Sequence, residues 1–227
     1  MRTVTAVAHR GDPYHHRENT LASLHSALRQ GADAVEIDVR LTRDGVPVLL
    51  HDATLKRLWQ QDRPLAALSS DEVRGLTGGG VPALAEALEA TAGSRVMVDL
   101  PGSPTAGAVR RIVDVVRQCD ARERVYYCAG AQAMLAVRAA DPSAEIALTW
   151  TTLAPPRPAV LDAVRPRWLN YRFGLIDEAL VSRVRGSGHL LSAWTPDTRR
   201  AMRRLVALGV DSITTNRIDA LRTVCEA

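Results

Sequence analysis

Short apolar runs alternate along the chain with longer segments of helical periodicity. The runs with the character of β-strands are Val4–Ala8, Ala34–Leu41, Pro47–Leu50, Arg95–Leu100, Arg124–Cys128, Glu145–Thr149, Arg167–Tyr171, Leu190–Trp194 and Ser212–Thr215. Between them, apolar residues three and four positions apart predict helices. Examples are Thr20–Gln30, Ala83–Ala92, Ala106–Gln118, Ala131–Ala140, Asp177–Arg185 and Thr198–Leu208.

This alternation predicts a parallel sheet covered by helices. Eight of the apolar runs are each followed by a helix-like segment, which is the pattern of right-handed strand–helix–strand units. One connection differs, because only Arg43-Asp44-Gly45 separates two of the runs, and Asp-Gly in such a place predicts a β-hairpin. We therefore expect one α/β domain over residues 1–227, a (β/α)₈ barrel with a hairpin extension of its second strand. A doubly wound open sheet is the alternative.

In such a barrel the functional residues lie where the strands end and the following loops begin. Polar residues at these ends are His9-Arg10-Gly11, Glu36, Asp38, Asp99, Trp194 and Asn216, and His51-Asp52 ends the hairpin arm. A two-residue turn at Asp44-Gly45 would place Asp38 opposite His51, and a bulge would shift that register by one. In either register we expect two carboxylates and an imidazole to share one patch.

The acidic residues of this patch predict a metal site. Glu36 and Asp38 are two positions apart on one strand, so their side chains point the same way. Close carboxylates repel one another unless a cation compensates their charge, and oxygen ligands favour a hard ion, Mg²⁺ or Ca²⁺. Asp99, on the next strand of the barrel, is a natural third ligand.

Composition limits the class of protein. A content of 46% apolar and 24% charged residues argues against intrinsic disorder. The longest apolar runs, Val46–Leu50 and Arg95–Leu100, are far shorter than the roughly 20 residues that span a bilayer, so we expect no membrane insertion. The first residues reach the charged pair His9-Arg10 too soon for the apolar region of a signal peptide, which makes the cytoplasm the expected compartment.

Aromatic content and the spacing of charged residues and cysteines exclude several classes of partner and site. The formal net charge is +4, but the arginines are scattered at helical spacing and the 4 Trp, 4 Tyr and 1 Phe are few, so we expect no nucleic-acid partner. The three cysteines, Cys119, Cys128 and Cys225, lack the spacing of a disulfide framework or a zinc site. The sequence leaves the oligomeric state open.

Several of these segments together resemble the glycerophosphodiester phosphodiesterase family. The resemblance rests on His9-Arg10-Gly11, Glu18-Asn19-Thr20, Gly31–Val39, Thr42–Gly45 and His51–Arg57. Later segments that resemble the family are Val81–Leu88, Ala193-Trp194-Thr195 and Gly209–Asn216. The resemblance implies a barrel related to those of phosphatidylinositol phospholipases and sphingomyelinase D.

The resemblance also implies a role for individual residues. By position, His9 and His51 match the catalytic histidine pair, Arg10 a phosphate-binding arginine and Trp194 an aromatic residue of the substrate pocket. The residues that match the family's three metal carboxylates are Glu36, Asp38 and Asp99. The implied activity is metal-dependent hydrolysis of a small glycerophosphodiester to an alcohol and glycerol 3-phosphate, with the histidines as general acid and general base in an order that the sequence does not assign.

The chain departs from the family pattern at three strand ends. The third metal carboxylate is followed by Leu100-Pro101, where the family has an apolar residue and lysine. The fourth strand ends in Tyr126-Tyr127-Cys128-Ala129-Gly130, where a serine–phenylalanine pair is common, and Asn216 stands where aspartate is usual. Two alternative functions therefore stay open. One is a phospholipase-D-like enzyme for lysophospholipid or sphingolipid head groups, and the other is a catalytically weak protein that binds phosphate esters.

Overall fold

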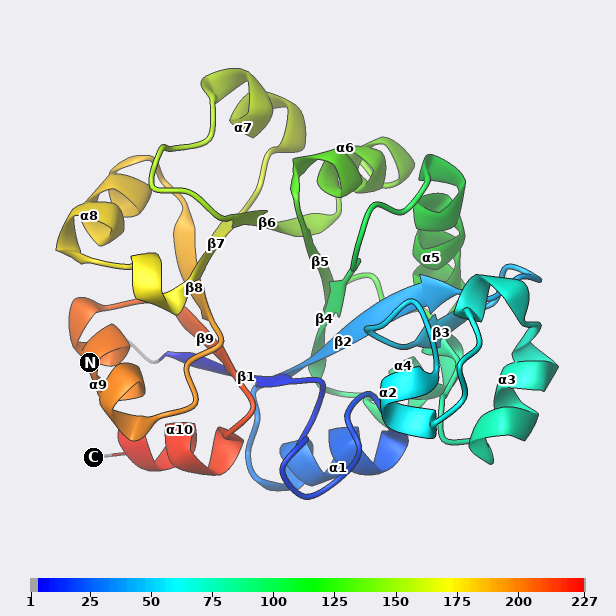
Figure 1. Cartoon of the computed structure of the whole chain (residues 1–227). Coiled ribbons are helices and arrows are strands. Elements are labelled where there is room, and N and C mark those ends of the chain that lie inside the picture. Colours follow the sequence, from blue (N-terminus) through cyan, green and yellow to red (C-terminus); the bar gives the residue numbers. More distant parts are fainter. Residues whose placement is uncertain (1–3, 227) are drawn as a thin grey trace.

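Eight parallel strands close into a barrel in the computed structural model, which describes residues 4–226 (Figure 1). They are β1 (Thr5–His9), β2 (Ala34–Leu41), β4 (Arg95–Asp99), β5 (Val125–Ala129), β6 (Glu145–Trp150), β7 (Trp168–Arg172), β8 (Leu190–Trp194) and β9 (Ser212–Thr215). Strand β1 pairs with both β2 and β9, which closes the sheet. The predicted (β/α)₈ barrel is confirmed, and the open sheet is excluded.

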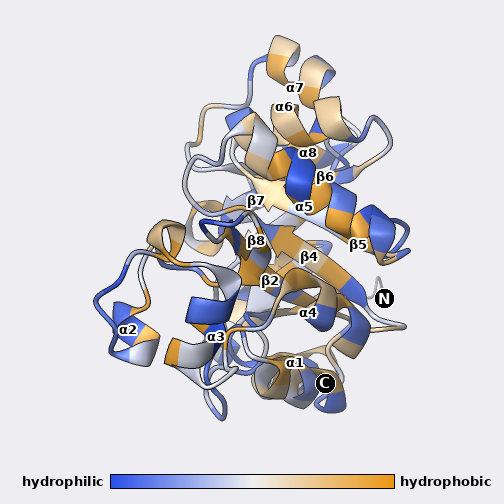
Figure 2. Ribbon diagram, turned by 90° about the vertical axis from the view of Figure 1, so that its right-hand side faces the viewer, coloured by the Kyte–Doolittle hydropathy of each residue, from blue (hydrophilic) through white to orange (hydrophobic). Residues whose placement is uncertain are grey.

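Helices surround the barrel as an outer ring. They are α1 (Leu21–Arg29), α4 (Leu84–Ala90), α5 (Ala106–Gln118), α6 (Ala131–Ala140), α7 (Pro158–Val164), α8 (Glu178–Gly186), α9 (Arg199–Leu208) and α10 (Ile218–Cys225). Thr20, Thr105 and Thr198 begin three of them by accepting a hydrogen bond from a backbone N–H of the first turn. Figure 2 shows hydrophobic and hydrophilic bands side by side on α5, as expected of a helix with one face on the barrel.

Two apolar clusters fill the barrel wall and its interior. The larger cluster lies between strands and helices, where outward-pointing residues such as Ile37, Val98 and Leu169 meet the helix faces. The smaller one consists of Val7, Ala34, Met97, Tyr126, Cys128, Ala147 and Trp168. Successive side chains of a strand alternate between the two faces, so the inward-pointing residues beyond this second cluster reach the carboxyl-terminal mouth of the barrel.

The hairpin arm extends β2, but its turn is longer than predicted. Strand β3 (Pro47–Leu49) pairs antiparallel with β2, and Leu41 lies opposite Pro47. Three residues, 43–45, form the turn, with Gly45 at a φ of 78° and its N–H donating to the Thr42 carbonyl at 3.0 Å. A left-handed glycine after a tight turn adds one residue to the loop, which shifts the register by one. Asp38 therefore pairs with Leu50, whose N–H lies 3.0 Å from the Asp38 carbonyl, and not with His51. Of the two registers expected from the sequence, the one shifted by a single residue is found.

A small apolar cluster of its own stabilises the arm. It joins β3 to the connecting segments α2 (Lys56–Trp59), η1 (Leu65–Ala67) and α3 (Ser70–Thr77). Its buried members are Val48, Leu50, Leu55, Leu65, Leu68, Val73 and Val81. Two of its members, Leu50 and Leu55, directly precede and follow residues 51–54 in the sequence. The cluster therefore anchors both ends of this segment and holds His51 next to the end of β2. A short 3₁₀ helix, η2 (Phe173–Leu175), follows β7 on another side of the barrel.

Gly11 allows the loop after β1 to lie directly on α1. It has a φ of 85°, and a Cβ built on it would lie 2.4 Å from the Ser23 hydroxyl oxygen and 2.6 Å from the Ser23 carbonyl carbon. We expect Gly11→Ala to lower the free energy of unfolding by more than about 2 kcal/mol, because α1 must shift. Gly45→Ala is the matched control: it has a similar φ but open space, so its loss should be about 1 kcal/mol. Equal losses in urea denaturation would contradict the steric argument.

Candidate active site

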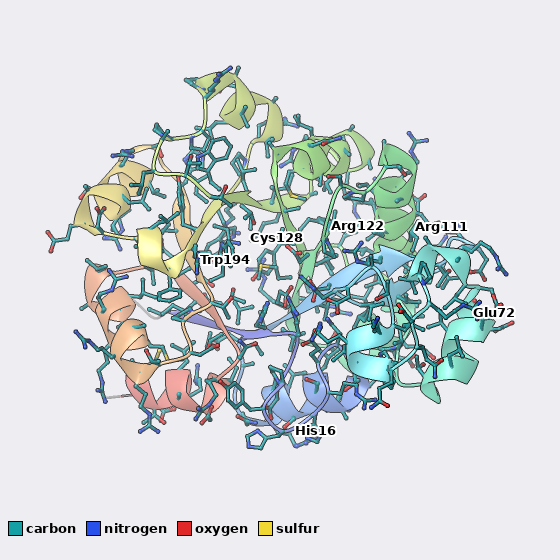
Figure 3. The ribbon with its side chains drawn as sticks, viewed as in Figure 1. His16, Glu72, Arg111, Arg122, Cys128 and Trp194 are labelled. Atoms are coloured by element: carbon teal, nitrogen blue, oxygen red, sulfur yellow. The ribbon has the colours of Figure 1, made fainter. Side chains whose placement is uncertain are left out.

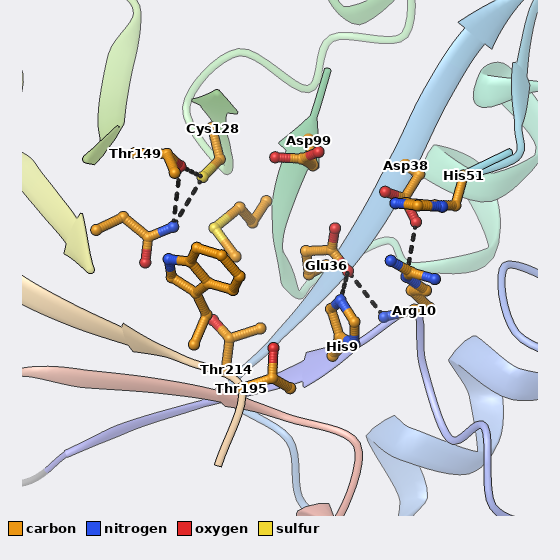
Figure 4. A pocket seen from close by; sticks show the side chains of 13 residues that line it. His9, Arg10, Glu36, Asp38, His51, Asp99, Cys128, Thr149, Thr195 and Thr214 are labelled. Atoms are coloured by element: carbon orange, nitrogen blue, oxygen red, sulfur yellow. Dashed lines mark hydrogen bonds and ion pairs between the residues drawn. The ribbon is translucent and has the colours of Figure 1, made fainter. Parts of the chain in front are cut away.

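A cavity of about 220 Å³ opens at the carboxyl ends of the strands (Figure 4). All seven residues predicted for the site line it, namely His9, Arg10, Glu36, Asp38, His51, Asp99 and Trp194. We call the first six of these the charged half of the cavity. Its neutral half consists of Cys128, Thr149, Asn170, Trp194 and Thr214, one from each of the strands β5 to β9. Figure 3 places Cys128 and Trp194 at the centre of the barrel.

Three carboxylates of the charged half converge. Glu36, Asp38 and Asp99 each offer an oxygen, and these oxygens all lie within 4.8 Å of one another. The register of β2 and β4 pairs Asp38 directly with Asp99, which explains why residues so distant in sequence meet. Burial, together with the charges of the neighbouring carboxylates, raises the pKa of Glu36 well above its usual range and that of Asp99 to about 7. Such a set of oxygen donors fits a hard divalent cation, whose charge would offset this repulsion.

Arg10 connects these carboxylates with the loop that follows β1. Its backbone N–H donates to Glu36 Oε2 at 2.8 Å, and its Nε lies 3.0 Å from Asp38 Oδ2. The backbone of Arg10 has a φ of 58°, a left-handed conformation that turns the chain sharply as it leaves β1. This turn places both the amide and the guanidinium of one residue against the acidic cluster.

Glu18 and Asn19 support the site in a way that the sequence analysis did not predict. The Asn19 amide donates to Asp38 Oδ2 at 2.8 Å and accepts from the Asp38 backbone N–H at 3.2 Å. Glu18 accepts from Arg10 at 2.9 Å and also from Arg57. The two residues were part of the family resemblance, but their contacts depend on how the loop folds back over β2.

His9 has a neutral hydrogen-bond partner. Its Nδ1 lies 2.8 Å from Asn216 Oδ1, while the Asn216 amide nitrogen donates to Asp197 Oδ2 at 2.8 Å. The Asn216 oxygen can only accept, so His9 Nδ1 donates and the lone pair of a neutral ring lies on Nε2, 4.0 Å from Glu36 Oε2. Burial, followed by the charge of Arg10, lowers the pKa of His9. The arrangement therefore favours a neutral imidazole with its free nitrogen near the carboxylates.

His51 has a charged partner instead. Its Nδ1 donates to Asp52 Oδ1 at 2.8 Å, and Arg57 Nε donates to the other oxygen of the same carboxylate at 2.6 Å. The hydrogen bond from Arg57, with that from His51, lowers the pKa of Asp52 to about 2. Asp52 is thus a fixed carboxylate that orients the His51 ring, the contact that the adjacent positions of the two residues suggest.

A hydrogen-bonded triad lies in the neutral half. The Asn170 amide nitrogen donates to Cys128 Sγ and to Thr149 Oγ1, at 3.2 Å in each case, and Cys128 and Thr149 are also 3.2 Å apart (Figure 4). Burial raises the pKa of the Cys128 thiol well above its usual range, so this cysteine remains protonated. The sequence analysis missed the triad as a group, because its members lie on three different strands and no spacing in the sequence connects them.

An acidic cluster, two histidines and an arginine at the carboxyl-terminal mouth of a barrel are groups that can hold a cation, transfer protons and bind an anion, as hydrolysis of a phosphate ester requires. Residues 9–220 match the family model described as the glycerophosphoryl diester phosphodiesterase family. The chain belongs to this family and is a phosphodiesterase.

Individual relatives agree with this assignment. The chain is 30% identical to "Probable glycerophosphodiester phosphodiesterase 2" of Mycobacterium tuberculosis, over 96% of this chain and 89% of the relative. It is 27% identical to the glycerophosphodiester phosphodiesterase of Caldanaerobacter subterraneus, over 95% of each chain.

Solved structures show the same fold. A phosphodiesterase of Oleispira antarctica in complex with the product sn-glycerol-3-phosphate has a TM-score of 0.87 and 23% identity, with 99% of this chain and 98% of that chain covered. The glycerophosphodiester phosphodiesterase of Thermotoga maritima has a TM-score of 0.84 and 20% identity, with 99% of each chain covered.

Within residues 4–226, no helix is long and apolar enough to cross a membrane.

Proposed function

We propose that this chain is a divalent-metal-dependent hydrolase that cleaves small glycerophosphodiesters to an alcohol and glycerol 3-phosphate. The observation that carries the proposal is the convergence of the three carboxylates, the two histidines and Arg10 on one cavity. A phosphodiester is a stable anion, so its hydrolysis requires charge neutralisation, an activated nucleophile and a protonated leaving group. The charged half contains groups suited to each of these tasks.

Glu36, Asp38 and Asp99 would hold one Mg²⁺ or Ca²⁺, as their buried oxygen donors fit such an ion. When bound, this ion would supply positive charge to the non-bridging oxygens of the phosphate. Arg10 adds a second positive group at the same place, and its ion pairs with Asp38 and Glu18 fix the direction of its guanidinium. Pro101 contributes no charge at the position where the family resemblance implies lysine, so the positive side chain that lines the cavity is that of Arg10.

The two histidines divide the proton transfers in this proposal. His9 is the general base, because its Nδ1 is bound to the Asn216 oxygen and its Nε2 is free to take a proton from the nucleophile, either water or a substrate hydroxyl whose cyclic product water then opens. His51 is the general acid and gives a proton to the leaving oxygen, while Asp52 keeps its ring in place. Asp197 acts through Asn216, because its two oxygens accept from the Asn216 backbone and amide and so determine which amide atom faces His9.

A substrate panel tests the proposed function. Glycerophosphocholine, glycerophosphoethanolamine and lysophosphatidylcholine are each incubated with Mg²⁺ or Ca²⁺, and with a chelator as the control. We expect turnover of the first two only, and only with the metal. Turnover of the lysophospholipid alone would favour the phospholipase-D-like alternative, and binding of the glycerophosphodiesters without turnover would favour the binding-protein alternative.

Trp194 lines the cavity and carries no group that could transfer the protons of the proposed reaction. Trp194→Ala should therefore raise KM for a glycerophosphodiester by about 10-fold or more and change kcat by less than about threefold, as expected for loss of uniform binding. Steady-state kinetics measures both constants. A variant with an unchanged KM and a much lower kcat would show that the indole acts on the reacting groups instead.

A further inference from the structure

A second cavity, of about 180 Å³, lies beside the active site. Its walls come from the end of β2, the segments that follow β3 and β4, and the helix α5. Among the described residues that line it, only Arg40 and Ser103 are polar, and only Arg40 is charged. The second cavity is therefore an apolar space with a single positive group.

Three chain segments connect the two cavities. In each segment, a residue of the active-site cavity is followed two positions later by a residue of the second cavity, namely Asp38 by Arg40, His51 by Ala53 and Asp99 by Pro101. Side chains two positions apart on a strand share a face, so Arg40 continues the row of Asp38 along β2. The second cavity thus begins on the side of the active site that carries His51.

Arg40 offers its terminal nitrogens to this second cavity. Its Nε donates to the His51 carbonyl oxygen at 2.8 Å, and within residues 4–226 its guanidinium forms no ion pair. A Cβ built on Gly102 would lie 3.7 Å from both Nη1 and Nη2 of Arg40. The two terminal nitrogens are therefore next to the loop after β4, which is part of the wall of the second cavity.

The half-buried guanidinium lacks a counterion at contact distance. Burial lowers the pKa of Arg40, and the more distant carboxylates of Asp38, Asp52 and Asp99 oppose this shift. An arginine nevertheless stays charged at neutral pH. A cation that is partly removed from water is stabilised by an anion that reaches it, so the chemistry of Arg40 favours an anionic ligand.

The proposed mechanism determines which half of the diester lies on this side. His51 gives its proton to the leaving oxygen, so the alcohol that departs is the half next to His51. The second cavity begins at that point, and its volume accommodates an alcohol of a few carbon atoms.

We propose that the second cavity binds the leaving alcohol of the diester and that Arg40 selects alcohols with an anionic group, such as a carboxylate. This inference rests on the proposed function and deepens it, because it names the chemical class of the alcohol half. An alcohol with a quaternary ammonium group would bring a second cation next to Arg40 and is therefore disfavoured.

Two diesters of glycerol 3-phosphate test the inference, one with 4-hydroxybutanoate and one with 4-hydroxybutanamide as the leaving alcohol. The two have nearly the same shape and differ in one charge. We expect the wild type to prefer the carboxylate ester by about 10-fold or more in kcat/KM, the effect of one hydrogen-bonded charge. Arg40→Gln should reduce this preference to less than about twofold, and Arg40→Lys should keep about threefold or more.

Arg111→Gln is the matched control. The Nε of Arg111 donates to the Gly45 carbonyl oxygen, as that of Arg40 does to His51, but Arg111 is exposed on α5 and lines neither cavity. This variant should keep the preference of the wild type. A wild type without preference, or an Arg40→Gln variant that loses both esters to the same extent, would overturn the inference, because Arg40 would then act only on the position of His51.

A substitution that fills the second cavity tests where the alcohol lies. Ala108 is half-buried on α5 and lines this cavity. Ala108→Phe should lower kcat/KM for the 4-hydroxybutanoate ester by about 10-fold or more, and that for the methyl ester of glycerol 3-phosphate by less than about twofold. Equal effects on the two esters would contradict this placement of the alcohol.

Binding of the intact diesters separates this inference from the proposed function. Turnover of the carboxylate and amide esters with equal kcat/KM would overturn the inference and leave the proposed function intact. If the wild type turns over no diester, the proposed function fails, and calorimetry then measures the affinity for the two esters. Tighter binding of the carboxylate ester by the wild type, with no such difference in Arg40→Gln, would support the inference in that case, and equal affinities in the wild type would overturn it.

Discussion

His9→Ala and His51→Ala should each lower kcat for a glycerophosphodiester by at least about 100-fold, the lower range for a positioned acid or base. His9 would lose the free Nε2 that Asn216 orients, and His51 would lose the proton donor that Asp52 orients. Neither change should unfold the protein, because both side chains line the cavity and belong to none of the apolar clusters. Steady-state kinetics and thermal unfolding measure the two effects.

An exposed histidine provides the control for this experiment. His25 lies on α1 with its side chain exposed, and His25→Ala should keep both kcat and the unfolding temperature. If His51→Ala instead unfolds the protein while His9→Ala keeps near-normal turnover, the paired-histidine mechanism is wrong. The binding-protein alternative or a mechanism with a single base would then replace it.

Asp99→Asn should remove metal binding and reduce activity to the level seen with a chelator. At pH 8, Mg²⁺ or Ca²⁺ at about 100 times its dissociation constant should stabilise the wild type by about 2.7 kcal/mol, because only the folded state brings the three carboxylates together. In Asp99→Asn this gain should vanish. The metal-free variant should be at least as stable as the metal-free wild type, since one of three mutually repelling carboxylates is gone.

The readouts are thermal unfolding with and without metal, and initial rates. Asp71→Asn is the matched control, since Asp71 is exposed on α3 and does not line the cavity. This variant should respond to metal as the wild type does. Full activity of the wild type in chelator would show that the carboxylates are not a catalytic metal site. An undiminished metal response in Asp99→Asn would show that Asp99 is not a ligand.

The sequence predicts those parts of the site that depend on strand periodicity. Glu36 and Asp38 point the same way because side chains on a strand repeat every second residue. Asp99 joins them because consecutive parallel strands pair in register, Asp38 with Asp99. The sequence leaves the hairpin register open by one residue, because it depends on the backbone conformation of Gly45, which the Asp-Gly pair does not specify.

Contacts that form only when the barrel closes cannot be predicted from local patterns in the sequence. His9 and Asn216 stand 207 positions apart and meet only because β1 pairs with β9. The neutral half poses the same difficulty, since Thr149, Asn170 and Thr214 lie on three different strands, and their spacing in the sequence does not indicate that they meet. Their contacts become evident only when the strands are side by side.

The most direct test of the account is a ³¹P NMR time course of the wild type with glycerophosphoethanolamine, first in chelator and then with excess Mg²⁺ or Ca²⁺. The account predicts an unchanged diester signal in chelator, and after addition of the cation its conversion to the monoester signal of glycerol 3-phosphate. Monoester formation at the same rate in chelator, or no monoester with either cation, would contradict it.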